Sequence, residues 1–121
     1  MIYESGEMYL ETILILSQSQ NEVHAVDIAG AMNISKASVS RALGRLKSEG
    51  CLIIDAAGRI AFTERGRNIA EKIYERHEIL SKMLESLGVP AEIAAADACK
   101  IEHDISDETF ELIKEHYLKN K

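Results

Sequence analysis

The chain has 121 residues, of which 46% are hydrophobic and 28% charged, and its formal net charge is −6. This length and composition fit one compact domain, or one small domain with an association segment, and exclude an intrinsically disordered chain. No apolar run reaches membrane-spanning length, and no basic region precedes an apolar one at the N-terminus. We therefore expect a cytoplasmic protein without a membrane partner.

The N-terminal half predicts a first helix over about residues 4–17, a polar loop over 18–22, and two short helices between Val26 and Gly50. Asn33 and Ile34 interrupt the helical pattern, and Ser35 can cap the helix that follows. The expected core positions of the three helices are Tyr9, Ile13 and Leu16, then Ile28, Ala29 and Met32, then Val39, Leu43 and Leu46. The closely spaced helix pair indicates a helix-turn-helix.

The polar face of the third helix carries hydroxyl groups and positive charges. Together with the capping Ser35, the residues on or near this face are Lys36, Ser38, Ser40, Arg41, Arg45 and Lys47. A helix-turn-helix protein places such donors in the major groove, so we predict binding to double-stranded DNA. We expect Ser38, Ser40 and Arg41 to contact base edges, and the remaining bases to contact phosphates. The alternative is a helix pair packed for stability alone.

A hairpin is predicted directly after this helix pair. The apolar segments 51–54 and 59–62 predict two strands, and residues 55–58 predict the turn between them. A hairpin in this place is typical of the wing of a winged helix-turn-helix. Arg59, near the tip, is expected to contact a phosphate.

The charge distribution reconciles DNA binding with the acidic composition. Between Lys36 and Lys47 the chain has four bases and no acid, whereas acids dominate between Asp97 and Glu115. An acidic protein is repelled from DNA at long range. We therefore expect DNA contact through the first half of the chain, and a cation bound among the acids of the second half would reduce the repulsion.

Three further helices are predicted in the second half. Thr63 can cap a long helix that ends at Gly88, the next helix covers about residues 91–103, and Ser106 can cap the last. The expected apolar faces comprise Ile69, Ile73, Leu80, Leu84 and Leu87 on the long helix, and Phe110, Ile113 and Tyr117 on the last. These helices bury little surface by themselves, so we expect a two-fold homodimer.

Residue types that bind metals recur at helical spacing. Cys99, Glu102 and His103 stand at i, i+3 and i+4, which places them on one face of a helix. Met8 and Glu11 are three residues apart on the first helix, and His77 lies late in the long helix. Each fragment alone is more often structural: a lone cysteine is usually a small buried hydrophobe, and a Glu-His pair is usually a solvated face.

The segments EMYLETI, YERHEIL and ACKIEHDIS, together with the winged helix-turn-helix, occur in an order that resembles the diphtheria toxin repressor family, which includes the manganese transport regulators. The resemblance covers nearly the whole chain. It implies a mainly α fold, with a winged helix-turn-helix DNA-binding domain over residues 1–63 and a helical dimerisation and metal-binding domain over 64–121. It also implies a metal-activated repressor whose ligand positions are Met8, Glu11, His77, Cys99, Glu102 and His103.

Two ligand positions separate the branches of the family. The manganese-type branch has Asp in place of Met8 and Glu in place of Cys99, whereas the iron-type branch has Met and Cys there. Because thioether and thiol sulfur suit softer metals than carboxylates do, we expect Fe(II), with Mn(II) as the alternative. As in the manganese type, we expect no third, SH3-like domain. Ser81 and Ala95 replace a carboxylate and an imidazole of the iron type's ancillary site, so we expect one primary site, formed by Met8, Cys99, Glu102 and His103. A second site, as in the manganese type, stays open and would use Glu11 and His77 with Glu102 bridging.

The sequence therefore predicts a metal-dependent transcriptional repressor rather than an enzyme. Metal binding is expected to fix a dimer geometry in which two reading helices stand roughly 34 Å apart on a palindromic operator. One alternative is a winged-helix regulator that senses a non-metal signal, such as a thiol switch at Cys99. Another is a metal-storage protein or metal-dependent enzyme with a vestigial helix-turn-helix.

Overall fold

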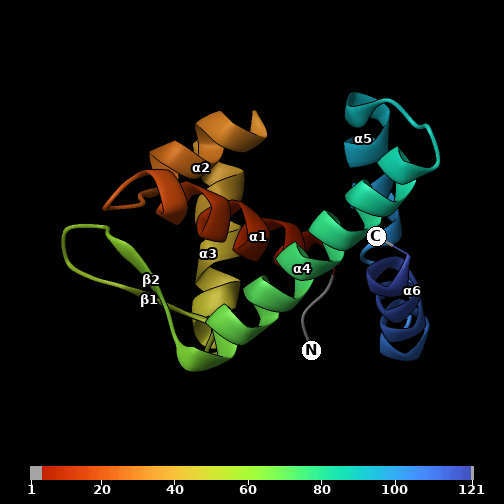
Figure 1. Ribbon diagram of the computed structural model, residues 1–121. Helices are drawn as coiled ribbons and strands as arrows, with labels where there is room; N and C mark the ends of the chain where they lie inside the picture. The colour runs from red at the N-terminus through yellow and green to blue at the C-terminus, as the bar shows by residue number, and fades with distance from the viewer. Residues whose placement is uncertain (1–3, 121) are drawn as a thin grey trace. The chain divides into compact units, whose positions relative to one another are not determined.

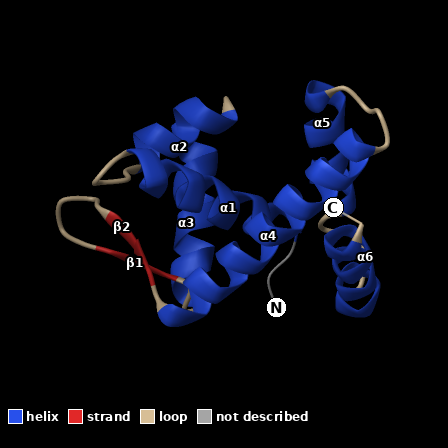
Figure 2. Cartoon of the chain, in the orientation of Figure 1, coloured by secondary structure: helices blue, strands red, loops and turns tan. Residues whose placement is uncertain are grey.

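A computed structural model describes residues 4–120 of the chain (Figure 1). Within this range the elements are α1 (Glu4–Ser19), α2 (Ala25–Met32), α3 (Lys36–Ser48), β1 (Leu52–Ile54), β2 (Ile60–Phe62), α4 (Glu64–Ser86), α5 (Ala91–Ile101) and α6 (Asp107–Lys119). The predicted fold class, mainly α with a winged helix-turn-helix followed by a helical segment, is confirmed (Figure 2). None of the helices described is both long and apolar enough to cross a membrane.

The chain divides into two compact units, and each has its own internal packing. Unit 1 covers Met1–Glu71 and unit 2 covers Lys72–Lys121, so the boundary falls within α4.

Unit 1 contains the helix-turn-helix, in which α1, α2 and α3 pack on one another. The connection between α2 and α3 forms as predicted: Asn33 takes a left-handed conformation with φ 56°, and Ser35 Oγ accepts a hydrogen bond of 3.1 Å from the Ser38 N–H. The core side of α1 differs in detail from the prediction. Leu10 and Leu14 are buried together with Ile13, whereas Leu16 is only half-buried, because the apolar stripe of this helix is centred one residue away from the predicted positions.

The wing is a two-stranded antiparallel hairpin in which Leu52 pairs with Phe62 and Ile54 with Ile60. The outer edge of β2 is also occupied, since the Ile60 N–H donates to the Val23 carbonyl at 2.9 Å. Gly58 supplies the left-handed turn at φ 84°. These backbone bonds fix the wing relative to the segment that leads into α2.

Unit 2 is built around Leu80, Ala98 and Phe110, which bring α4, α5 and α6 together. The half-buried residues packed against this cluster are Ile79, Met83, Ile101, Ile105 and Ile113. The prediction that Leu87 belongs to the apolar face of the long helix is wrong, because α4 ends at Ser86 and Leu87 is 74% exposed. The α5 helix also ends earlier than predicted, so Glu102 and His103 lie in the turn that follows it.

Candidate functional site

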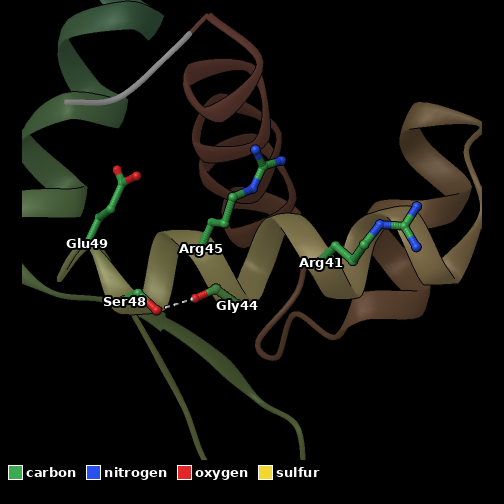
Figure 3. A pocket seen from close by; sticks show the side chains of 5 residues that line it. All are labelled: Arg41, Gly44, Arg45, Ser48 and Glu49. Atoms are coloured by element: carbon green, nitrogen blue, oxygen red, sulfur yellow. Dashed lines mark hydrogen bonds between the residues drawn. The ribbon is translucent and has the colours of Figure 1, made fainter.

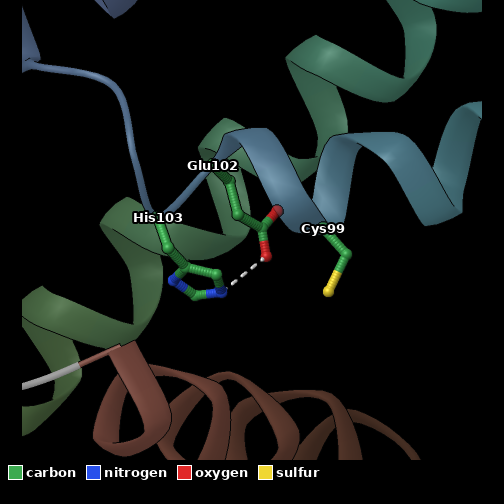
Figure 4. Close-up of side chains that lie close together, drawn as sticks. All are labelled: Cys99, Glu102 and His103. Atoms are coloured by element: carbon green, nitrogen blue, oxygen red, sulfur yellow. Dashed lines mark ion pairs between the residues drawn. The ribbon is translucent and has the colours of Figure 1, made fainter.

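Cys99, Glu102 and His103 form a compact cluster at the end of α5. Their ligand atoms, one from each side chain, all lie within 4.8 Å of one another (Figure 4). Although Glu102 follows the last residue of the helix, its backbone keeps helical angles (φ −58°, ψ −26°) and its N–H donates to the Ala98 carbonyl. The i, i+3, i+4 spacing therefore still places the three side chains on one face.

The carboxylate of Glu102 lies between two imidazoles. Its Oε2 is 2.9 Å from Nδ1 of His77 on α4, and its Oε1 is 3.3 Å from Nε2 of His103. Glu102 is 0% exposed, and the side chain of His103 is equally buried. Burying a carboxylate costs folding free energy unless the group is paired. The two imidazoles are therefore needed where they are. The Cys99 thiol, the Glu102 carboxylate and the His103 imidazole are donors that fit a divalent transition metal, and the His77 imidazole contacts the same carboxylate from α4.

The remaining predicted ligand positions belong to α1 in unit 1. Glu11 is buried and Met8 is half-buried, and their separation of three residues places them on one face of that helix. The positions discussed for an ancillary site offer little: Ser81 is buried, and its Oγ has no hydrogen-bond partner among the described residues, while Ala95 has no ligand atom.

Arg76 is a site residue that the sequence reasoning missed. It is 5% exposed and bonds the carbonyls of Glu102 at 2.8 Å and Ile105 at 2.9 Å, and the carboxylate of Asp107 at 2.5 Å. Lys72 donates to the same Asp107 oxygen at 2.7 Å, and this bond, together with the charges of Lys72 and Arg76, lowers the pKa of Asp107. One sequence signal was available: Arg76 occupies a position in the apolar stripe of α4, four residues before Leu80.

The candidate nucleic-acid surface is the exposed side of α3. Val39, Leu43 and Leu46 are buried, as predicted for the core side of this helix. The exposed residues comprise Lys36, Ser40, Arg41, Arg45 and Lys47, with the capping Ser35 also exposed and Ser38 half-buried.

Two hollows flank this exposed surface. One, of about 670 Å³, is lined by Arg41, Gly44, Arg45, Ser48 and Glu49, and both guanidinium groups project from α3 beside it (Figure 3). The other, of about 430 Å³, lies between α3 and the wing, and its lining includes Ser40, Lys47 and Asp55. Gly44 lines both hollows and has no side chain to fill the space between them. Arg41 and Arg45 line the first hollow, and Lys47 lines the second.

Arg59 in the wing carries a compensated charge. Its Nε lies 2.6 Å from Oδ2 of Asp55 and 3.7 Å from Oε1 of Glu22, although the side chain is 56% exposed. The backbone N–H of Arg59, together with its guanidinium, lowers the pKa of Asp55. Within unit 1, Arg59 is therefore engaged by two carboxylates rather than directed freely to solvent.

Comparisons with known families cover almost the entire chain. Residues 1–57 match the family model described as the iron dependent repressor, N-terminal DNA binding domain, and residues 63–120 match the iron dependent repressor, metal binding and dimerisation domain. Transcriptional regulator MntR of Escherichia coli O6:H1 is 33% identical over 106 residues, which cover 88% of this chain and 68% of the relative. An uncharacterized HTH-type transcriptional regulator of Methanocaldococcus jannaschii is 32% identical over 113 residues, which cover 92% and 90% of the two chains.

Solved structures give the same fold. A manganese-dependent transcriptional repressor in complex with manganese matches with a TM-score of 0.83 at 24% identity, over 93% of this chain and 52% of the other. The chain thus spans about half the length of that protein. At this identity the match supports the arrangement of the elements and carries no information about individual site residues.

Proposed function

Because this chain belongs to the iron-dependent repressor family, the family of the diphtheria toxin repressor and the manganese transport regulators, we propose that it is a divalent-metal-dependent transcriptional repressor acting on DNA as a homodimer. The observation that carries the proposal is the fully buried Glu102 between the imidazoles of His77 and His103, with the thiol of Cys99 beside it. The family resemblance, rather than this geometry, adds Met8 and Glu11 of α1 to the proposed ligand set.

The proposed ligands act by restricting conformation. Burial leaves the negative charge of Glu102 without solvation by water. A bound divalent ion would supply a positive charge shared by Glu102 and the neighbouring donors. With Met8 from α1 in one ligand set with Cys99, Glu102 and His103 from the end of α5, fewer arrangements of the dimer remain accessible. We infer that the favoured arrangement separates the two α3 helices by roughly 34 Å, one turn of DNA, which matches a palindromic operator.

Unit 2 is proposed to carry the dimerisation surface. It includes the residues of the matched dimerisation domain from Lys72 onward. Several large apolar side chains of this unit are exposed: Leu87, Ile93, Leu112 and Leu118. Burial of such side chains against a second copy is the usual way in which a small helical domain completes its core.

Fe(II) is the proposed metal because Met8 and Cys99 offer thioether and thiol sulfur, whereas Mn(II) prefers hard oxygen ligands. The second candidate is an Mn(II)-responsive repressor, which is favoured by the names of the relatives, several of which are regulators called MntR.

An anaerobic melting panel with Mn(II), Fe(II), Co(II) and Zn(II) tests the proposed function directly. We expect one ion to raise the melting temperature through ligand linkage, and the same ion to increase retention of duplexes from a randomised DNA pool. Equal DNA retention with and without a chelator contradicts the proposal and favours a winged-helix regulator that senses a non-metal signal.

Replacing Met8 with aspartate tests the metal preference. The expected result is a lower Mn(II) concentration and a higher Fe(II) concentration at the midpoint of metal-dependent DNA binding, because a hard oxygen replaces a soft sulfur. Met8→Leu is the matched control, since it removes the sulfur at similar volume and should weaken the Fe(II) response without improving the Mn(II) response. Unchanged midpoints in both variants show that Met8 is not a ligand.

For DNA we propose that Ser38, Ser40 and Arg41 contact base edges. Ser40 and Arg41 are exposed on α3, where each lines one of the two hollows, and Ser38 is half-buried on the same helix. The proposed phosphate contacts are Lys36, Arg45, Lys47 and Arg59, with Ser35 at the N-terminus of the helix. Ser35 and Ser38 also bond each other in the helix cap at 3.0 Å, so their hydroxyl groups are held in fixed positions.

The charge compensation of Arg59 leads to a separate prediction about DNA affinity. In Asp55→Asn the amide oxygen can still accept the Ala57 and Arg59 backbone N–H bonds, both 2.9 Å, while the negative charge disappears. We expect tighter binding at low salt and a slope of log affinity against log salt that is steeper by about one, as one more phosphate is neutralised. Titrations at several salt concentrations measure this slope. Glu108→Gln, which removes an equal charge from the exposed start of α6, is the control; equal slopes in both variants would reject a direct role for Arg59.

A further inference from the structure

We propose that Arg76 is the positioning residue of the candidate metal site: its guanidinium holds the turn that carries Glu102 and His103 in the conformation in which both can act as ligands. This inference rests on the proposed function, because it concerns the same ligands. It assigns a role to a residue that has no place in the expected ligand set.

The contacts of Arg76 span the whole turn between α5 and α6. Nη1 donates to the carbonyl of Glu102, the residue that ends α5, and to the carbonyl of Ile105. Nη2 donates to Asp107 in the first turn of α6. The guanidinium carbon also lies 5.3 Å from the centroid of the Phe110 ring, so a core aromatic covers one face of the group. The turn from 102 to 107 is thus fixed at its start, its middle and its end by one side chain.

The location of this charge is electrostatically favourable. The last carbonyls of α5 have no partners within the helix, and a cation at a helix C-terminus is stabilised by the aligned peptide dipoles. Asp107 provides the complementary anion at the start of α6, where a negative charge is favoured. The planar guanidinium holds its five N–H donors in a rigid fork that reaches two carbonyls and a carboxylate in separate directions, whereas a lysine ammonium is a compact point charge with three donors on one nitrogen.

The consequence for the ligands follows from chain connectivity. Glu102 contributes its carbonyl to Arg76 and its carboxylate to the imidazoles of His77 and His103, so both ends of this residue are restrained from α4. His77 is the next residue after Arg76 on the same helix. One turn of α4 therefore provides one candidate ligand and also holds the segment that carries two others. Partners that orient metal ligands in this way typically change metal affinity by 10- to 100-fold when they are removed.

The test compares Arg76→Met with Lys72→Met, using Co(II) as the probe. Lys72 bonds the same Asp107 oxygen from an exposed position, so its variant removes a cation from this carboxylate without touching the carbonyls. The intensity and energy of the Co(II) absorption bands report the coordination geometry, and titration gives the affinity. In the metal-free protein, amide hydrogen exchange of residues 102–107 measures the order of the turn.

We expect Arg76→Met to bind Co(II) about 10- to 100-fold more weakly with an altered spectrum, and to exchange the amides of 102–107 faster. Lys72→Met should match the wild type, and Arg76→Lys should recover part of the affinity because an ammonium can still donate to one carbonyl. The lysine variant also keeps the test decisive if the methionine variant does not fold. Wild-type Co(II) affinity, spectrum and exchange in the Arg76 variants overturn the inference. A wild-type protein without a Co(II) spectrum rejects the proposed function instead, and exchange then still shows whether Arg76 orders the turn.

Discussion

Gly66→Ala is expected to destabilise unit 1 by about 3 kcal/mol or more, at the upper end of the usual cost of overpacking. A Cβ added to Gly66 would lie 1.9 Å from the carbonyl oxygen of Cys51 and 2.8 Å from its carbonyl carbon. These are backbone atoms, so a change of side-chain rotamer cannot relieve the clash. The normal effect of this substitution inside a helix is the opposite, because alanine is favoured over glycine by roughly 0.5–1 kcal/mol.

The surroundings of Gly66 explain why the backbone cannot easily move. Thr63 donates from its hydroxyl to the Gly50 carbonyl at 2.6 Å and accepts the Gly66 N–H at 3.1 Å. The Thr63 N–H in turn donates to the Cys51 carbonyl at 3.1 Å. The start of α4 is therefore bonded to the segment between α3 and β1, and moving one away from the other breaks several hydrogen bonds at once.

Urea unfolding midpoints measure this effect, and Gly30→Ala is the matched control. Gly30 lies in α2 with no atom within 4 Å of an added Cβ, so alanine there should stabilise the protein slightly. The same substitution of glycine by alanine is thus predicted to lower the stability at one helical glycine and to raise it at the other. Stabilisation in both variants would show that the close approach of α4 to Cys51 does not hold in solution.

The sequence was sufficient for features that depend on neighbouring residues. The cap at Ser35, the break at Asn33 and the cap at Ser106 each involve partners within a few positions, and each forms as expected. The compact grouping of Cys99, Glu102 and His103 follows from the same local logic, because helical spacing alone brings these side chains to one face.

Features that depend on distant partners were not predictable in this way. Periodicity marks Arg76 only as a charged residue in an apolar stripe, whereas its partners lie 26 to 31 positions further along the chain. The pairing of Arg59 with Asp55 was missed for another reason: the turn bends the chain so that the guanidinium returns to a carboxylate four residues earlier. In both cases the folded protein already pairs the positive charge with its own carboxylate or carbonyl oxygens.

The exposure of Leu87 shows the limit of periodicity at the end of a helix. The spacing of apolar residues continues through Leu87, but the helical backbone stops at Ser86 and Gly88 takes a left-handed conformation. Once the helix ends, the next side chain no longer points toward the face that the pattern predicts. Its exposure then favours burial against a second copy of the chain, as proposed above for unit 2.

Glu102→Gln is expected to abolish both the metal-dependent rise in melting temperature and metal-dependent DNA binding. At an ion concentration about 100 times the dissociation constant, binding stabilises the wild type by about 2.7 kcal/mol, or about 10 °C for a chain of this size. Glutamine has nearly the same shape as glutamate but lacks the negative charge that makes the carboxylate a strong ligand. Melting curves and DNA titrations with and without the preferred ion measure the loss.

The metal-free form of this variant separates a ligand role from a structural one. If Glu102 served only to hold His77 and His103, removing its charge would weaken two contacts of 2.9 and 3.3 Å and lower the melting temperature without metal. As a metal ligand it also carries a buried charge whose loss of hydration opposes the metal-free fold and offsets these contacts, so Glu102→Gln should melt close to the metal-free wild type. Glu92→Gln, on the exposed surface of α5, should leave both the metal response and the metal-free stability unchanged. A Glu102→Gln protein that is less stable without metal, yet keeps its full response to the ion, would assign Glu102 to the scaffold and require a different carboxylate in the site.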